Sequence, residues 1–370
     1  MIDLTSTNIV DGGFHSTVMV GLLPVDVTDN KVGGTIVTTG VDSVSKTANK
    51  DDPGYQEDFW IMAPLQGPES FAYENSTRIQ IGMGATDVGE LSSANATSDP
   101  TTLELNGTPP KDIDWQGTGN GIDSEETVKL KINGDQTARE LPVRIKTMKY
   151  REVVVRVYPV RHKQNFAAVP VPNALTFKQE LNKIFAYQLN AWITLDIQPE
   201  EFYDYAGASG TGFDDGYLLT AKAQAEQDMI NDSKFPRENA HIVVFLIDRT
   251  AYISDGTKAY GSAWPPAALP LSTDNVCVVN VWDNDFSAAR SELAVIRTVA
   301  HEMGHVMLGE GHPDVDAENP NGAGVAPLVG ADPKKRLMHK FAYQEIEAKL
   351  LVKKEWDAAE QWLKKFINVP

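Results

Sequence analysis

The sequence predicts two parts of different fold class: an all-β, sandwich-like region over residues 1–148 and an α+β domain over residues 149–370. In the first part, short apolar or alternating runs are separated by turn signals such as "NGTPP" and "INGD", which is typical of antiparallel sandwiches. In the second part, apolar runs of strand length alternate with segments of helical periodicity, which predicts a mixed sheet with helices. At 370 residues the chain is long enough for both, and the first part could hold two small sandwich modules.

The second part is expected to contain four strands. They are "YREVVVRVYPV" at 150–160, "ITLDIQP" at 193–199, "HIVVFLID" at 241–248 and "CVVNVW" at 277–282. The third of these is apolar almost throughout, so we expect it to be buried on both faces of the sheet.

Three helices are expected among these strands. The segment "TFKQELNKIFAYQLNAW" begins with a capping box of Thr176 and Gln179, and its apolar side chains share one helical face: Phe177, Leu181, Ile184, Phe185, Leu189 and Trp192. A second helix starts after Ser287 or Ser291, either of which can cap it, and runs into a histidine-rich segment. The C-terminal segment 344–366 has apolar residues at helical spacing and is expected to form the third.

Composition excludes several classes of partner. The net charge of −18 argues against nucleic-acid binding, which requires a basic face, and against adhesion to an anionic membrane surface. No apolar run is long enough to span a bilayer.

The segment "MIDLTSTNIVDGG" lacks the basic and apolar regions of a signal peptide, so we expect a secreted protein whose signal has been removed, with a cytoplasmic protein as the alternative. Nothing in the sequence specifies an oligomeric state.

The chain has a single cysteine, Cys277, which excludes an intrachain disulfide framework. It lies in the apolar run "NVCVVNVW". We therefore expect a buried structural thiol.

The motif that carries chemistry is "TVAHEMGHVMLGEGHP" at residues 298–313. His301 and His305 are four residues apart, so in a helix both side chains lie on one face and can hold one zinc ion. Glu302 lies beside the ion, where a carboxylate can take a proton from water activated by zinc and pass it to a leaving amine. This pattern predicts a single catalytic Zn²⁺.

The segment "VAHEMGHVMLGEGHP" resembles the zinc helix of the metzincin metalloendopeptidases. In that family a glycine ends the helix three residues after the second histidine, and the third histidine ligand follows three residues later. Here Leu308 and Gly311 occupy those positions, and Gly309 and His312 each come one residue late. The resemblance implies a zinc-dependent endopeptidase with a protein or peptide substrate, in which His301, His305 and His312 bind zinc and Glu302 is the general base and acid.

The one-residue shift sets a physical condition on His312. One extra residue rotates a helix by about 100° and advances it by about 1.5 Å. The helix end must therefore widen or exit into the turn, and both Gly309 and Gly311 are free to adopt positive φ there. The alternatives for the third ligand are carboxylates: Glu310, Asp314 and Asp316 in the turn, or Glu318, Glu345 and Glu347 further along, as in gluzincins.

Two further features match the family. Met338 in "KRLMHKFAY" corresponds to the methionine turn beneath zinc, but the position of the family's tyrosine is Lys340, with Tyr343 further on. His339 is therefore a candidate substitute for the tyrosine, or else an exposed loop histidine. The segment "YGSAWPPA" precedes the strand of Cys277, where the family has an edge strand that binds substrate by β-augmentation through Gly261, Ser262, Ala263 and Trp264.

A different class of function remains open from the sequence: a glycan- or protein-binding protein whose zinc domain has degenerated. The presence of Glu302 argues against it, because a purely structural zinc site does not need this carboxylate. Calcium is a further candidate ion, since "HPDVDAEN" and "DWQGTGNGIDSEE" offer oxygen ligands, but neither segment matches a defined calcium loop.

Overall fold

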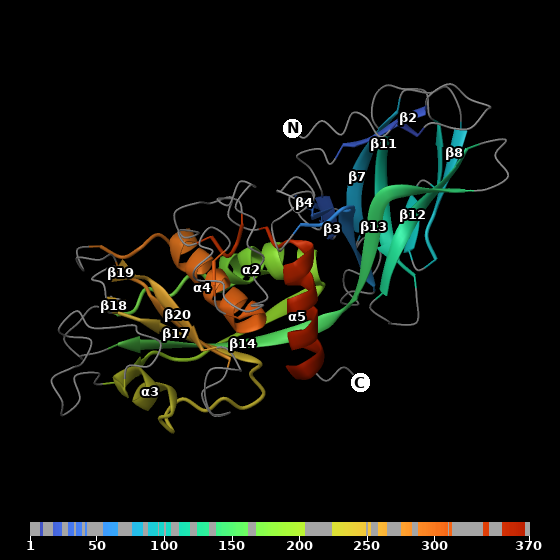
Figure 1. The fold of residues 1–370 in the computed structure, drawn as a ribbon. Helices are drawn as coiled ribbons and strands as arrows, with labels where there is room; N and C mark the ends of the chain where they lie inside the picture. The colour runs from blue at the N-terminus through green and yellow to red at the C-terminus, as the bar shows by residue number, and fades with distance from the viewer. Residues whose placement is uncertain are drawn as a thin grey trace. The chain divides into compact units, whose positions relative to one another are not determined.

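The chain is a mixed α/β protein with several sheets and few helices in its computed structural model (Figure 1). The structure describes residues 8–9, 18–23, 29–32, 35–38, 41–42, 55–65, 76–83, 88–94, 96–99, 101–104, 111–118, 124–132, 138–161, 168–203, 224–248, 251–252, 258–264, 275–282, 288–309, 311–312, 336–339 and 350–366. The chain divides into two compact units. One comprises residues 1–51, 55–150 and 185–191, and the other comprises residues 52–54, 151–184 and 192–370.

The strands of the first unit form two sheets. One is antiparallel, in the order β1-β2-β7-β11-β9, with β3 paired to β7 and β4 paired to β3. It consists of β1 (Asn8–Ile9), β2 (Val18–Leu23), β3 (Asp29–Val32), β4 (Thr35–Thr38), β7 (Ser76–Met83), β9 (Ala96–Asp99) and β11 (Lys111–Gly117). The other has the order β10-β8-β12-β13-β6-β5 and consists of β5 (Val41–Asp42), β6 (Phe59–Leu65), β8 (Val88–Ser92), β10 (Thr102–Glu104), β12 (Ser124–Ile132) and β13 (Arg139–Lys149).

Strand β6 is the buried centre of this unit. It pairs with β13 in parallel and contacts β7 and β11 of the other sheet. Its side chains from Trp60 to Leu65 are all buried, so the strand lacks the alternation that would reveal it in the sequence. The sandwich class of residues 1–148 remains a prediction, because much of this region lies outside the described residues.

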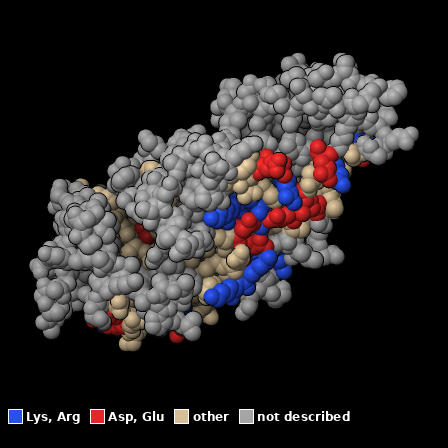
Figure 2. Space-filling model, viewed as in Figure 1, with Lys and Arg blue, Asp and Glu red and all other residues tan. Residues whose placement is uncertain are grey.

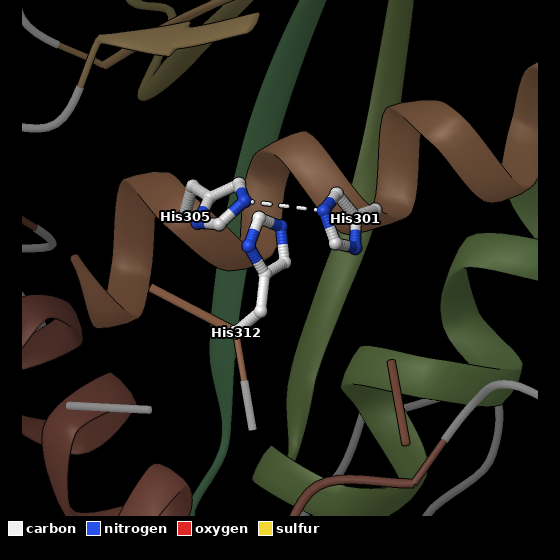
Figure 3. A group of neighbouring side chains, drawn as sticks. All are labelled: His301, His305 and His312. Carbon is white, nitrogen blue, oxygen red and sulfur yellow. Dashed lines mark hydrogen bonds between the residues drawn. The ribbon is translucent and has the colours of Figure 1, made fainter. Parts of the chain in front are cut away.

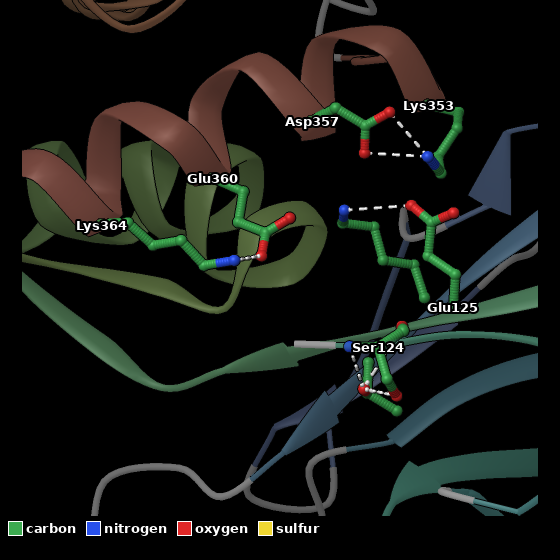
Figure 4. A network of polar contacts seen from close by, with 8 residues as sticks. Ser124, Glu125, Lys353, Asp357, Glu360 and Lys364 are labelled. Atoms are coloured by element: carbon green, nitrogen blue, oxygen red, sulfur yellow. Dashed lines mark hydrogen bonds and ion pairs between the residues drawn. The ribbon is translucent and has the colours of Figure 1, made fainter. Parts of the chain in front are cut away.

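Two cross-strand pairs hold β12 against β13 (Figure 4). Glu125 lies directly opposite Lys146, and the two form an ion pair of 3.4 Å. In the neighbouring pair, the hydroxyl oxygens of Ser124 and Thr147 are hydrogen-bonded at 2.8 Å. Ser124 N also donates to Thr147 Oγ1. Such pairs fix the register of a sheet and each contribute about 0.2–1 kcal/mol.

The second unit is built on a mixed sheet in the order β15-β14-β17-β21-β20, with β16 beside β14. Its strands are β14 (Arg151–Arg161), β15 (Ala191–Ile197), β16 (Glu201–Phe202), β17 (Ile242–Ile247), β20 (Gly261–Trp264) and β21 (Val276–Asn280). β14, β17 and β21 run parallel, whereas β20 pairs antiparallel with β21 and forms the edge. A separate hairpin joins β18 (Ala251–Tyr252) to β19 (Lys258–Ala259).

Helices cover both faces of this sheet (Figure 1). Every side chain of β17 and β21 is buried, as the apolar runs predict, and Cys277 is a buried free thiol. One face packs against α3 (Gln224–Ile230), whose Met229 and Ile230 join a cluster with Phe245 and Val278. The opposite face is contacted by α4 (Glu292–Leu308), and the remaining helices are α2 (Ala174–Leu189) and α5 (Lys353–Phe366).

The capping residue predicted for α2 was wrong. The helix begins at Ala174, and the side-chain oxygen of Asn173 accepts from Leu175 N at 3.0 Å and from Thr176 N at 3.2 Å. Asn173 thus satisfies the first free amides, and Thr176 lies inside the helix.

The predicted end of α2 and the predicted start of α5 were also wrong. α2 ends at Leu189 because Asn190 adopts a positive φ of 49°, and Trp192 is therefore in β15, although it is buried as expected. α5 begins at Lys353, and residues 350–352 are not helical.

Helix α5 carries ion pairs between residues four positions apart in the chain. Lys353 bonds to Asp357 at 2.6 and 2.8 Å, and Lys364 pairs with Glu360 (Figure 4). On the face shown in Figure 2, acidic and basic side chains of the described residues are intermixed rather than separated by sign. In each α5 pair one partner is buried, Lys353 or Glu360, and the other is more exposed. Pairs at this helical spacing contribute about 0.2–0.5 kcal/mol each, so α5 is held mainly by its apolar face.

None of the described helices is both long and apolar enough to cross a membrane.

Candidate metal centre

Helix α4 carries the histidine motif and begins where the sequence predicts. The Ser291 side chain accepts a hydrogen bond from Ala294 N at 3.3 Å and so caps the first turn. From Val295 to Leu308 the side chains are buried except at His305, which is partly exposed. The helix is therefore a core element, and its position is fixed by packing rather than by exposed charges.

The rings of His301 and His305 meet above one face of α4 (Figure 3). Their Nε2 atoms are 3.1 Å apart. On the other side of each ring, His301 Nδ1 is 2.8 Å from Leu337 O, and His305 Nδ1 is 3.2 Å from Gly309 O. Because a carbonyl oxygen only accepts, each Nδ1 must carry the proton of its neutral ring, which leaves both Nε2 atoms without one.

The turn after α4 brings His312 to the same point. Gly309 N bonds to His305 O at 2.8 Å in the regular helical pattern, so the helix end is not widened. The chain then turns with φ of 92° at Gly309 and 117° at Gly311, values that favour glycine. The His312 ring stacks on that of His301 with centroids 5.3 Å apart, and its centroid is 5.1 Å from that of His305.

These three histidines can hold a metal ion. One nitrogen of each lies within 4.8 Å of the others, and among the described residues this is the one group of three or more His, Cys, Asp or Glu with that property. Two nitrogens bound to a tetrahedral zinc at about 2.05 Å lie about 3.3 Å apart, close to the observed Nε2 separation. The two facing Nε2 lone pairs repel each other, and a cation between them removes that repulsion.

Electrostatics keep His301 and His305 neutral. Burial lowers the pKa of His301 well below its ordinary value, and the neighbouring His305 and His312 lower it further, against the opposing effect of the Leu337 carbonyl. Burial and His312 likewise lower the pKa of His305 to about 3. Neutral imidazole is the form that binds metal, so both rings are ready to do so at neutral pH.

Glu302 lies under the edge strand of the sheet. Its side chain is 6% exposed and lies against the backbone of Gly261 in β20. Burial raises the pKa of the Cys277 thiol well above its usual value, and the charge of Glu302 raises it further, so the carboxylate lies near the α4-facing side of β21.

Met338 lies beneath the histidine helix, in a turn that spans residues 336–339. A methyl group on Gly304 would overlap the Met338 sulfur, so the absence of a side chain at Gly304 lets the sulfur approach the helix between the two histidines. The preceding residue, Leu337, supplies the carbonyl that holds His301. His339 completes the turn and is 7% exposed, so it is not an exposed loop residue.

The candidate substrate strand, Gly261–Trp264, is an edge strand as expected. It pairs through its full length with β21, and β21 is its one partner among the described residues. Ser262 is buried, whereas Gly261 and Ala263 are partly exposed.

Several alternative ligands lie outside the described residues: Glu310, Asp314, Asp316, Glu318, Glu345 and Glu347. Lys340, Tyr343, residues 313–319 of one candidate calcium loop and residues 119–123 of the other also lie outside them. The sequence reasoning missed the carbonyls of Leu337 and Gly309, which bond to the histidines, because backbone groups leave no trace in residue identity. It also missed the contacts at Gly261 and Gly304, for which a glycine in an otherwise apolar strand or helix was the available signal.

No protein-family model and no curated protein matches the sequence. Among solved structures, the chain is similar to archaemetzincin from Methanopyrus kandleri, with 12% identity over 57% of this chain and 96% of that one and a TM-score of 0.34. It is also similar to archaemetzincin from Archaeoglobus fulgidus in complex with malonate, with 12% identity over 56% and 99% of the two chains and a TM-score of 0.26. A Bacteroides ovatus GH5 xyloglucanase in complex with a XXXG heptasaccharide matches with 12% identity over 68% and 61% and a TM-score of 0.19.

Proposed function

We propose that the protein is a zinc-dependent endopeptidase whose metal ligands are His301, His305 and His312. The observation that carries this proposal is the pair of unprotonated Nε2 atoms that face each other at 3.1 Å, with His312 stacked beside them. Three histidines leave a fourth zinc position for water or substrate, which is the arrangement of a catalytic site. Bound zinc would supply Lewis-acid chemistry, by lowering the pKa of water to about 7 and polarising the scissile carbonyl.

Glu302 is the proposed general base and acid. It neighbours His301 in the chain and is held in a largely buried position, where it can accept a proton from the attacking water and deliver it to the leaving amine. The Leu337 and Gly309 carbonyls orient the imidazoles by fixing the proton on Nδ1. The Met338 sulfur fills the space under the site without binding the ion.

A peptide is the proposed substrate. An edge strand offers a row of backbone donors and acceptors, to which an extended peptide can add as a further strand. Gly261–Trp264 provides this row beside Glu302, and the resemblance of residues 298–312 to the metzincin zinc helix supports the same substrate class.

The test is peptide cleavage by the purified protein, with metal content measured on the same sample. Zinc should co-purify at about one ion per chain, chelation should abolish cleavage, and added zinc should restore it. Glu302→Ala should keep the zinc and the fold while turnover falls by about 10²–10⁴-fold, since it removes only the proton acceptor.

Two outcomes would contradict the proposal. Zinc binding without cleavage of any peptide in a diverse library would favour a binding protein with a degenerate site. Normal cleavage by Glu302→Ala would remove this residue from the mechanism. An anomalous-scattering map at the zinc edge would separate a His312 ligand from a carboxylate ligand.

A further inference from the structure

Gly261 occupies a position in which no side chain fits. A Cβ placed on it would be 2.5 Å from Glu302 Oε1, 2.7 Å from Glu302 Cγ and 2.8 Å from Glu302 Cδ. A real Cβ atom essentially never lies within 3.0 Å of a heavy atom outside its own residue and its neighbours in the chain. The Glu302 side chain therefore fills the volume that any other residue in this position of the strand would need.

The strand cannot move aside without breaking its pairing. Gly261 lies opposite Val279 in the β20–β21 ladder, and just before the strand Asn280 N donates to Tyr260 O at 2.9 Å. The guanidinium of Arg290 stacks over the Tyr260 ring at 4.1 Å from its centroid.

Arg290 also ties the start of the strand to α4. The same guanidinium donates to Thr298 Oγ1 at 2.7 Å and to Ala294 O at 3.1 Å, both in the helix that carries Glu302. The distance between the Gly261 backbone and this helix is thus fixed from both sides. Because the helix and the strand backbone are both held, a methyl group added at Gly261 would be accommodated by a change in the Glu302 side-chain rotamer, since its Cγ, Cδ and Oε1 atoms all lie in the overlap.

We propose that Gly261 is a positioning residue for Glu302, resting on the role proposed above for that carboxylate. The bare backbone at Gly261 lets the carboxylate lie under the edge strand, next to the histidine cluster. A methyl group there would force Glu302 into another rotamer while leaving the zinc ligands in place. A displacement of about 1 Å in a catalytic group can cost about 10²-fold in rate.

Gly261→Ala is the variant that tests this proposal. We expect zinc content within error of the wild type, a melting temperature lowered by no more than a few degrees, and kcat lowered by about 10²-fold with a much smaller change in KM. A crystal structure of the variant should show the Glu302 carboxylate displaced and the three histidines unmoved. This structural result does not depend on activity, so it stands or fails even if the wild type cleaves no peptide.

A truncated side chain provides the matched control. In a Glu302→Ala background the Cγ, Cδ and Oε1 atoms next to Gly261 are absent, so adding Gly261→Ala should lower the residual kcat by no more than about twofold beyond Glu302→Ala alone. Gly117→Ala places a similar methyl group in β11, with its Cβ 3.2 Å from that of Leu65, and should leave kcat unchanged.

Two results would overturn the proposal. One is a Gly261→Ala structure with Glu302 in its original position and the strand shifted instead. The other is an equal fold-loss of kcat when Gly261→Ala is introduced into the wild type and into the Glu302→Ala variant, which would show general damage to the strand. Failure of the proposed function itself would differ from both, because the wild type would then be inactive while the displacement of Glu302 could still be observed.

Discussion

Arg336 and Glu355 form an ion pair that is almost completely withdrawn from solvent, with side-chain exposures of 1% and 0%. Glu355 lies in the first turn of α5, where it also accepts a hydrogen bond from Val352 N at 3.0 Å. Arg336 is the residue before Leu337, whose carbonyl holds the His301 ring. The ion pair therefore connects the C-terminal helix to the orientation of one proposed zinc ligand.

Breaking this pair should affect both stability and zinc binding. Glu355→Gln leaves a buried guanidinium without its counter-charge, which typically costs about 3–5 kcal/mol in unfolding free energy. Because the turn that carries Leu337 loses its anchor, zinc affinity should fall by about 10–100-fold. Urea unfolding and a competitive zinc titration measure the two effects.

An apolar replacement of the pair is the matched control. Arg336→Met combined with Glu355→Leu removes both charges and should recover most of the stability lost in Glu355→Gln. If Glu355→Gln leaves both stability and zinc affinity unchanged, the pair does not anchor the turn.

Gly304→Ala should disturb the contact with Met338. The added methyl group overlaps the sulfur, and overpacking of this kind costs about 1–3 kcal/mol. The loss should shrink in a Met338→Ala background, where the space is vacant. Thermal unfolding of the four proteins in the cycle measures this coupling, and an equal loss in both backgrounds would exclude the contact as its cause.

His312→Ala and Glu310→Ala distinguish His312 from Glu310 as the third ligand. Loss of His312 should weaken zinc binding strongly, whereas loss of Glu310 should change it little, because His312 is already stacked against His301. Deletion of Leu308 restores the metzincin spacing and should preserve zinc binding. Zinc titration of the three variants checks this prediction, and the reverse order of losses would show that Glu310 is the ligand.

The zinc-free protein should lose stability as the pH falls below about 6.5. The pKa of His305 is about 3 in the folded protein, and an unfolded histidine has a pKa of about 6.5, so the unfolded chain binds more protons between these values. Each proton taken up on unfolding lowers the unfolding free energy by about 1.4 kcal/mol per pH unit in this range, and this group has no effect above it. Urea unfolding of chelator-treated protein between pH 4 and 8 measures the slope. His305→Asn should flatten it, and an unchanged slope would contradict the assignment.

The elements of the second unit were largely predictable, because each has a strong local signal. The apolar runs of β17 and β21 and the Ser291 cap of α4 follow from pattern alone, whereas the edge position of Gly261–Trp264 was expected from the resemblance to the metzincins. The errors arose where two local signals competed. Asn173 displaced Thr176 as a cap, and a positive φ at Asn190 ended α2 before Trp192.

The sequence was enough to propose the three histidines of the site, but not the groups that pack against them. Helical spacing predicts that His301 and His305 share a face, and the glycines allow the turn that brings in His312. The Leu337 carbonyl and the Met338 sulfur reach the helix from residues more than thirty positions away in the chain. Contacts at that separation depend on how the whole unit packs, which no local pattern encodes.

The three histidines come from a single run of twelve residues, 301–312. Closing so short a loop costs little chain entropy compared with joining strands such as β14 and β17, whose paired residues lie more than eighty positions apart. The segment proposed to bind metal can therefore form as soon as α4 and its end turn do, before the sheet is assembled. A zinc ion captured at that stage would stabilise the helix end early and favour the later pairing of the strands around it.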